Sequence, residues 1–259
     1  MLNRPAVLIT GGGKRIGAAL ARSFGKAGWH VIIHYRSSQR EAEALAAELP
    51  STETIRFDLR DARAPIDAVK AIAGRMPDWR VLVNCASIFQ NDDVTALDPA
   101  TYDAAMRINA RTPVQLAQTF LREAKSKAGR HVIQFTDMKL ENPNPDFFSY
   151  TMSKHAVAGA IPMLSMARTD SRDRVYGLAP GAILASHDQK EEETEISHKL
   201  NLLGRKTNLQ DVCETALFLA AGHLASGETI FVDSGQHLLD QPRDVIYLAR
   251  GETGTGDLA

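Results

Sequence analysis

The strongest constraint on the fold of this chain is a regular alternation of short apolar runs with segments of helical periodicity. Seven runs rich in β-branched residues predict strands, at 6–10, 30–35, 54–59, 80–85, 131–137, 174–178 and 228–233. The segment that follows the first run places Ile16, Leu20 and Phe24 four positions apart, as one apolar face of a helix requires. Repeated strand–helix–strand units predict a parallel sheet with helices on both faces.

Right-handed crossovers make this arrangement an α/β fold with a doubly wound parallel sheet, the Rossmann fold, in a single domain. Residues 1–240 are expected to form this domain, followed by a partly disordered C-terminal tail over 241–259. Within that tail the apolar stretch 245–248 is expected to dock on a neighbouring subunit or near its pocket. The charged segment 182–203 interrupts the alternation and is interpreted either as a mobile substrate flap or as a solvated surface helix.

Charge and composition exclude several classes of function. The formal net charge of −1, from 30 basic and 31 acidic residues, indicates no nucleic-acid surface. No apolar run is long enough to span a membrane, and the first residues lack the apolar stretch of a signal peptide. The eight histidines are scattered, so no metal site is expected. Cys85 and Cys213 are expected to be buried thiols in a reducing compartment, which predicts a cytoplasmic location.

A glycine-rich turn follows the first predicted strand and reads Thr10-Gly11-Gly12-Gly13-Lys14-Arg15-Ile16-Gly17. Glycines let the backbone turn sharply and approach a pyrophosphate, and the helix that follows offers free N–H groups at its N-terminus. The spacing is not that of the G-x-G-x-x-G fingerprint, so the support comes from the position of the turn between a strand and a helix. An ordinary tight turn is the alternative interpretation.

The end of the second predicted strand indicates which dinucleotide binds. Enzymes that use NAD usually carry an acidic residue here, which holds the ribose 2′-hydroxyl. This chain has His34-Tyr35-Arg36-Ser37-Ser38, without a carboxylate. Arg36, Ser37 and Lys14 would suit a 2′-phosphate, because an arginine pairs with phosphate through two N–H donors. The expected cofactor is therefore NADP(H).

Tyr150 and Lys154 lie four residues apart in the helix predicted over 149–168, so they share one face of it. A lysine ammonium beside a phenol favours the phenolate, so the pKa of Tyr150 is expected to be lowered. Such a pair can act as a general acid or base near neutral pH. The motif alone is common by chance, and its weight comes from its context.

That context resembles the short-chain dehydrogenase/reductase family, from about residue 6 to residue 235. The glycine turn, Asn84-Cys85-Ala86-Ser87, Asn109, the Tyr150–Lys154 pair and Pro180-Gly181 occur in the order typical of the family. By this resemblance Tyr150 would donate a proton, Lys154 would bind the nicotinamide ribose and tune Tyr150, and Asn109 would hold a water in a proton relay. The implied cofactor contacts include Gly11, Ile16, Gly17, Tyr35, Asp58, Leu59, Asn84, Ala86, Ser87, Pro180 and Gly181.

Departures from the family pattern resemble one branch of it, the pteridine reductases and bacterial dihydromonapterin reductases. Asp137 stands thirteen residues before the tyrosine, where the family usually has serine, and Arg15 replaces the middle glycine of the turn. Ser87-Ile88-Phe89 follows the fourth strand. The branch implies that Phe89 stacks on a pterin, that Arg15 and Ser87 hydrogen-bond pterin or cofactor, and that Asp137 with Tyr150 delivers a proton to a ring nitrogen.

Plainer roles stay open for three of these residues: Phe89 as a core residue, Arg15 as a phosphate ligand alone, and Asp137 as a hydrogen-bonding residue at a strand end. The expected function is NADPH-dependent reduction of a dihydropterin to a tetrahydropterin, with dihydrofolate as a secondary substrate. The alternatives are a carbonyl or 3-oxoacyl reductase, which Asp137 disfavours, and a non-catalytic NADP(H)-sensing protein, which the intact Asn109, Tyr150 and Lys154 disfavour. The resemblance also implies a homo-oligomer, a tetramer or dimer.

Overall fold

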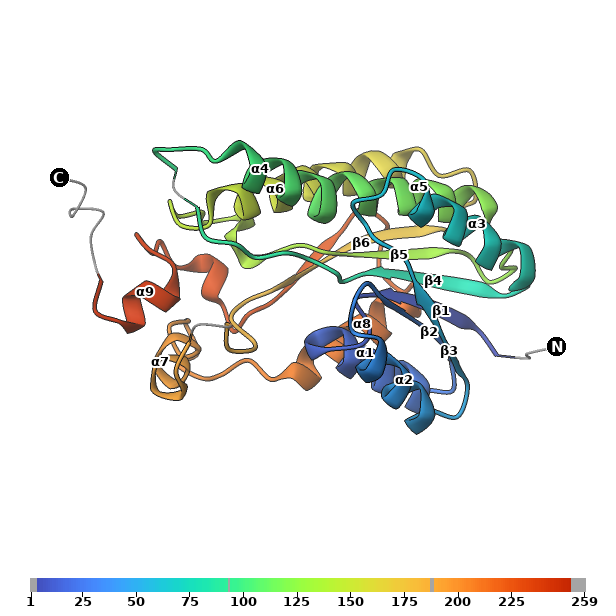
Figure 1. The fold of residues 1–259 in the computed structure, drawn as a ribbon, viewed down its shortest axis with the longest axis horizontal. Coiled ribbons are helices and arrows are strands. Elements are labelled where there is room, and N and C mark those ends of the chain that lie inside the picture. Colours follow the sequence, from blue (N-terminus) through green and yellow to red (C-terminus); the bar gives the residue numbers. More distant parts are fainter. Residues whose placement is uncertain (1–3, 93, 187–188, 253–259) are drawn as a thin grey trace.

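A seven-stranded parallel sheet runs through the centre of the molecule (Figure 1). The computed structural model describes residues 4–92, 94–186 and 189–252. The strands are β1 (Ala6–Thr10), β2 (His30–Tyr35), β3 (Thr52–Arg56), β4 (Trp79–Asn84), β5 (His131–Phe135), β6 (Arg174–Pro180) and β7 (Thr229–Val232). They are ordered β3-β2-β1-β4-β5-β6-β7, and all pairs are parallel. The predicted doubly wound α/β fold is confirmed.

Helices cover both faces of the sheet (Figure 1). One face carries α1 (Arg15–Lys26), α2 (Gln39–Glu48) and α8 (Leu209–Ala220). The other carries α3 (Ala64–Arg75), α4 (Pro99–Ala105), α5 (Thr112–Glu123) and α6 (Phe148–Met166). Each face has its own apolar core, because side chains alternate along a strand: Val7 and Ile9 point to one core, and Ala6 and Leu8 to the other. No helix in the described ranges is both long enough and apolar enough to cross a membrane.

Several element boundaries differ from the sequence prediction by a few residues, and two of the differences have identifiable reasons. The third strand ends at Arg56 rather than residue 59, because Phe57 and Leu59 leave the ladder to fill the core under α3 and α5. The helical stretch predicted at 99–127 is α4, a π-helical turn η1 (Met106–Arg111) and α5. Pro113 has no amide hydrogen and so cannot donate to the carbonyl of Asn109, which disrupts the α-helical ladder at that point.

Four short elements lie around the carboxyl ends of the strands. They are the 3₁₀ turns η2 (Met138–Leu140) and η3 (Gln236–Leu238) and the helices α7 (Glu191–Ser197) and α9 (Val245–Ala249). Helices α7 and α9 pack against each other at one end of the sheet (Figure 1). The apolar stretch 245–248 buries Val245 and Ile246 against its own chain, and residues 253–259 of the predicted tail lie outside the described residues. Docking of this stretch on a neighbouring subunit stays a prediction.

Candidate active site

A cavity of about 1070 Å³ extends along the carboxyl edge of the sheet. Its walls come from the glycine turn, the ends of β4, β5 and β6, the start of α6, and residues 180–184, 186, 189, 197–198 and 244–247. Fourteen of the sequence-predicted site residues line it: Gly11, Lys14, Arg15, Ile16, Gly17, Arg36, Ala86, Ser87, Phe89, Asp137, Tyr150, Lys154, Pro180 and Gly181. The remaining six, Tyr35, Ser37, Asp58, Leu59, Asn84 and Asn109, do not.

Glycine is required in the turn after β1 for steric reasons. Gly11 has φ +66, and a Cβ there would stand 3.0 Å from the backbone of Ala86. A Cβ on Gly17 would lie 2.2 Å from the carbonyl oxygen of Gly11, so only glycine lets α1 start this close to the turn. The hydroxyl oxygen of Thr10 accepts from the N–H groups of Cys85 and Ala86 at 3.0 and 3.1 Å, which joins the turn to the end of β4. The result is an open backbone cradle at a helix N-terminus, which fits a pyrophosphate.

A buried histidine that the sequence analysis did not single out supports this turn. The N–H of Gly11 donates to Nδ1 of His34 at 3.0 Å, and the Nε2 atom lies 3.1 Å from the carbonyl oxygen of Phe57. Because Nδ1 accepts, the ring is the neutral tautomer whose Nε2–H donates to Phe57. Burial lowers the pKa of His34 to about 4, which keeps the ring neutral near pH 7. The histidine is a backbone anchor for the glycine turn.

At the end of β2, the positions expected to bind a 2′-phosphate are partly assembled. Arg36 is exposed and lines the cavity, and no acidic residue of the kind usual in NAD enzymes follows β2. Lys14 also lines the cavity, with its ammonium 2.6 Å from a carboxylate oxygen of Glu41 on α2. Asp58 is held by Arg60, whose Nη2 lies 2.6 Å from Oδ2, and this pairing lowers the pKa of Asp58 to about 2. Arg60, which the sequence analysis missed, lines the cavity in place of Asp58.

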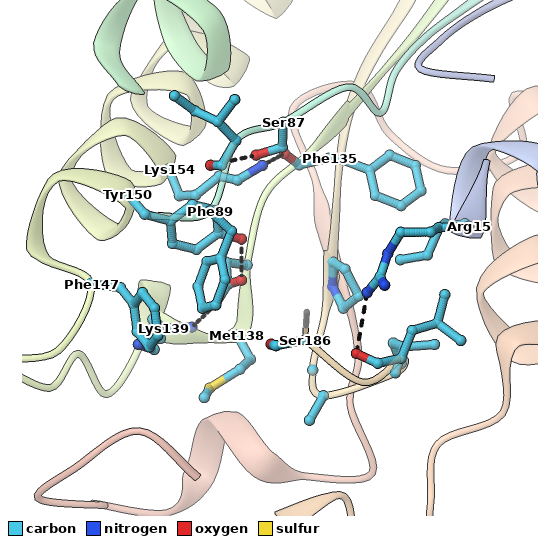
Figure 2. A pocket seen from close by; sticks show the side chains of 18 of the residues that line it. Arg15, Ser87, Phe89, Phe135, Met138, Lys139, Phe147, Tyr150, Lys154 and Ser186 are labelled. Atoms are coloured by element: carbon cyan, nitrogen blue, oxygen red, sulfur yellow. Dashed lines mark hydrogen bonds between the residues drawn. The ribbon is translucent and has the colours of Figure 1, made fainter. Parts of the chain in front are cut away.

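Asp137, Tyr150 and Lys154 come together where β5 ends and α6 begins, and Figure 2 shows Tyr150 and Lys154 on this side of the cavity. The hydroxyl of Tyr150 donates to Oδ2 of Asp137 at 2.6 Å. The ammonium of Lys154 donates to the carbonyl oxygen of Phe135 at 2.8 Å and lies 5.4 Å from the centre of the Tyr150 ring. The backbone N–H of Lys139 donates to Oδ1 of Asp137 at 2.9 Å, so both carboxyl oxygens are engaged.

The protonation of this cluster differs from the sequence expectation. Burial, together with the carboxylate of Asp137, raises the pKa of Tyr150 well above its ordinary value, so the expected lowering by Lys154 is wrong. Burial also raises the pKa of Asp137 and lowers the pKa of Lys154 to about 8. Sequence spacing could reveal the lysine but not the depth of the site, and desolvation outweighs the lysine here. The phenol is therefore held in its protonated, proton-donating form.

The side chains of Asn84 and Asn109 are used inside the protein instead of in the cavity. The amide nitrogen of Asn84 donates to the carbonyl oxygen of Pro113 and to Oε1 of Gln134, both at 3.0 Å. The amide of Asn109 donates to the carbonyl oxygen of Ile88 at 2.9 Å and to the hydroxyl of Ser153 at 3.0 Å. Its oxygen accepts from the N–H of Ile88. Asn109 thus fixes the loop that carries Ser87 and Phe89.

Aromatic rings form one wall of the cavity (Figure 2). Phe89 stacks on Phe147 with ring centres 3.9 Å apart, and the Tyr150 ring meets it edge-on at 4.7 Å. Phe89 still has 40% of its surface exposed, so it is not a core residue. Arg15 lies across the cavity from these rings, and its Nη2 donates to the carbonyl oxygen of Ala185 at 2.8 Å. A guanidinium has five N–H donors, so this contact leaves others for a ligand.

Several cavity residues carried no recognisable signal in the sequence. Lys139 belongs to a residue type that is usually exposed, yet its side chain is 3% exposed and pairs with Asp244. Phe147 has φ +55, a left-handed conformation that the sequence does not indicate. Ile246 and Tyr247 lie about a hundred residues further along the chain and pack beside Phe147 and Tyr150. Only the apolar character of 245–248 could have suggested that this segment docks.

A glycine turn suited to phosphate lies where the strand order of the sheet reverses, and a tyrosine–lysine pair lies further along the same cavity. The fold and the cavity together define a dinucleotide-dependent oxidoreductase. The sequence model of the short-chain dehydrogenases matches residues 5–196, and the chain belongs to that family.

Solved structures and curated relatives agree with this assignment. FolM alternative dihydrofolate reductase 1 of Brucella suis, crystallised with NADP, is 34% identical with a TM-score of 0.85, and the match covers 92% of this chain and 96% of that one. The Brucella canis FolM, also complexed with NADP, is 32% identical with a TM-score of 0.85 over 100% and 99% of the two chains. The D-xylose 1-dehydrogenase of Caulobacter vibrioides is 27% identical, over 88% of this chain and 94% of its own.

Proposed function

We propose that this protein is an NADPH-dependent reductase that converts a dihydropterin, such as dihydromonapterin or dihydrobiopterin, to the tetrahydropterin, with dihydrofolate as a further substrate. The observation that carries the proposal is the 2.6 Å hydrogen bond between Tyr150 and Asp137 beside the exposed ring of Phe89. The likeness to two FolM reductases, at 34% and 32% identity, supports the same chemistry.

NADP(H) is the cofactor in this proposal. Gly11, Gly17 and the N-terminus of α1 would hold the pyrophosphate, because they line the cavity and the first N–H groups of a helix have no partner within the helix. Arg36 and Lys14 would hold the 2′-phosphate, with Ser37 beside them. Bound at this edge of the sheet, NADPH supplies the hydride. Lys154 would contact the nicotinamide ribose, and Pro180-Gly181 would back the nicotinamide.

The protein's own task in reducing a ring C=N bond is to supply a proton to the nitrogen. Tyr150 keeps its proton because burial and Asp137 raise its pKa, and Asp137 is positioned to share that proton. A carboxyl group has two oxygens, so it can accept from a ring N–H through one and deliver a proton to a ring nitrogen through the other, whereas the serine usual in the family has a single hydroxyl that does not give up its proton. The pair of Asp137 and Tyr150 therefore suits a nitrogen-rich heterocycle better than a simple ketone.

The remaining substrate contacts are proposed from the two facing walls. The exposed part of Phe89 offers a π surface to a flat ring. The hydroxyl of Ser87 and the N–H donors of Arg15 that do not bind the 184–185 carbonyls would hydrogen-bond the pterin edge or the cofactor phosphates. A planar substrate with donors and acceptors around its rim matches a cavity of this kind.

A substrate panel tests the proposal. NADPH oxidation is measured with dihydromonapterin, dihydrobiopterin, dihydrofolate and a simple ketone, and NADP+ reduction is measured with D-xylose. We expect turnover with the pterins and a fall of about 100-fold in pterin kcat/KM for Asp137→Ser, the size of effect that loss of a general acid–base partner brings. Asp67→Ser, a change at an exposed carboxylate on α3, is the matched control. Preference for the ketone, or unchanged pterin kinetics in Asp137→Ser, would indicate a carbonyl reductase instead.

We further propose that the protein is a cytoplasmic homo-oligomer, a dimer or tetramer. The resemblance to its family supports the assembly, and the two free cysteines among the described residues are compatible with a reducing compartment. Light scattering coupled to size exclusion gives the mass directly, and a monomer of 28.3 kDa would contradict the assembly.

A further inference from the structure

Lys139 and Asp244 form a buried ion pair on the floor of the cavity. The ammonium lies 2.7 Å from the Asp244 carboxylate, and the two side chains are 3% and 6% exposed. The ammonium also donates to Oδ1 of Asn144 at 3.3 Å and to the carbonyl oxygen of Asp146 at 3.2 Å. Two charges removed from water are costly unless their geometry is good, and similar apolar residues often serve stability equally well. A pair of this kind at the edge of a proton-transfer cluster invites a functional explanation.

The pair joins two parts of the site that are far apart in sequence. The backbone of Lys139 holds Oδ1 of Asp137, the partner of Tyr150. Asp244 begins α9, where its carboxylate accepts from the N–H of Ile246 at 3.0 Å. Ile246 in turn packs against Tyr150 and Phe147.

The aromatic wall depends on the same connection. The Lys139 ammonium lies 5.1 Å from the centre of the Phe147 ring, which stacks on Phe89. Phe147 is also stacked with Tyr247, with ring centres 6.1 Å apart. The rings of Phe89, Phe147 and Tyr247 therefore connect the loop after β4 to α9, and Lys139 contacts the middle one.

We propose that Lys139 is a positioning residue of the reductase: through Asp244 it holds residues 244–247 as the outer wall of the substrate pocket, and with its charge it sets the proton-donating cluster. The catalytic half of this inference rests on the function proposed above. The wall is a matter of geometry alone and is tested separately.

The charges around Asp137 predict in which direction the pKa values of Asp137 and Tyr150 change when Lys139 is replaced. Asp137 is faced by Tyr150 and Lys154 from α6 and by Lys139 from η2, with Cys85 beyond Lys154 and Asp244 near Tyr150. Burial raises the pKa of Asp137, and the Lys139 cation opposes this. Loss of the cation would raise that pKa further, and the Asp244 carboxylate left behind would raise the pKa of Tyr150. Both changes move the loss of the donated proton to higher pH.

Four variants separate positioning from mere stability. Lys139→Met removes the cation and leaves Asp244 unpaired, and adding Asp244→Asn removes both charges. Lys139→Arg keeps the cation. Arg130→Met is the matched control, because Arg130 pairs with Asp173 at comparable burial, 15% and 1% exposed, where β5 and β6 begin and away from the cavity.

Trypsin reports on the wall without any substrate, because Arg243 and Arg250 flank α9. We expect Lys139→Met and the double variant to be cut there at least ~5-fold faster than wild type at equal thermal stability, since protection follows local opening. Arg130→Met should be cut at the wild-type rate. Wild-type protection in the double variant would overturn the wall, whether or not the protein reduces pterins.

Kinetics report on the cluster. In Lys139→Met we expect pterin kcat/KM to fall ~10-fold with NADPH affinity unchanged, and the alkaline limb of the kcat profile to move up by about one pH unit. In the double variant both opposite charges are absent, so the alkaline limb should return towards its wild-type position. Lys139→Arg keeps the cation and should retain most of the wild-type activity. An unmoved limb in Lys139→Met, with wild-type pterin turnover intact, would overturn the role of the charge and leave the proposed function standing. A wild-type protein inactive on every pterin would overturn the function instead.

Discussion

The cofactor side and the substrate side of the cavity are built by different means. On the cofactor side, the turn 11–17 is shaped by backbone sterics, by the hydroxyl of Thr10 and by the ring of His34. On the substrate side, the wall consists of side chains that hold one another: Phe89 on Phe147, Tyr247 on Phe147, and Lys139 on Asp244. The first side is built mainly by the backbone of one short segment, supported by His34 and the end of β4, and the second requires side chains of four segments to come together.

This difference predicts where substrate specificity lies. A backbone cradle tolerates change in its neighbours as long as the glycines remain. A wall of mutually supporting side chains changes when any member changes, because packed side chains leave few voids to absorb the difference. We expect specificity to reside in residues 89, 137–139, 147 and 244–247.

The largest effect expected on the substrate side is that of Tyr150→Phe. The variant keeps the ring that packs on Phe89 and Ile246 but loses the hydroxyl that donates to Asp137. We expect kcat to fall about 1000-fold, or about 4 kcal/mol in activation free energy, while the Kd for NADPH stays within about twofold. Stopped-flow hydride transfer and fluorescence titration of NADPH measure the two quantities. A loss of NADPH binding as large as the loss of rate would mean that the two sides are not separable in this way.

The sequence predicted the fold, and it carried a clearer local signal for the glycine turn of the cofactor side than for the walls of the substrate side. The periodicity of the strands and helices predicts the topology of the sheet, and the glycines at 11 and 17 indicate a tight turn in the backbone. Asp137 and Tyr150 were found because their spacing along the chain matches a family pattern. The partnership of Lys139 with Asp244 was not, because it joins residues more than a hundred positions apart and neither has a local signature. The direction of the Tyr150 pKa shift also failed, since burial depth is a tertiary property.

As the pH falls, protonation of His34 is expected to reduce the stability of the cofactor side first. Its pKa is about 4 in the folded protein against 6.5 for the ordinary group, so the unfolded chain binds a proton that the folded chain refuses between these values. The stabilising neutral ring is fully present above pH 6.5, and its contribution is lost as pH falls, by about 3 kcal/mol at pH 4. Protonation would also remove the acceptor of the Gly11 N–H.

Unfolding in urea between pH 7 and pH 4 measures this loss. His34→Asn should be less stable than wild type at pH 7, because it loses the stacking on Phe57, yet the gap should narrow as pH falls. Parallel curves for the two proteins would show that His34 does not anchor the turn through its neutral form. Buried His30 and His131 also have lowered pKa values and remain in both proteins, so the difference between the curves isolates His34.

The smallest of the three effects is expected where the cofactor side meets solvent, at Arg36. Removal of its guanidinium in Arg36→Ala should weaken NADPH binding about 10-fold, or about 1.4 kcal/mol, and leave NADH binding unchanged, because only NADPH carries the 2′-phosphate. Arg40→Ala removes the same charge from an exposed position of α2 that does not line the cavity, and its effect should be under about twofold. If both variants weaken NADPH binding equally, the preference for NADPH over NADH arises from the overall positive charge near α2 and not from one contact. If only Arg36→Ala weakens binding, even the solvent-exposed edge of the cofactor side recognises NADPH through a defined contact. The two sides then differ in whether backbone or side chains form the wall, and not in how specific their contacts are.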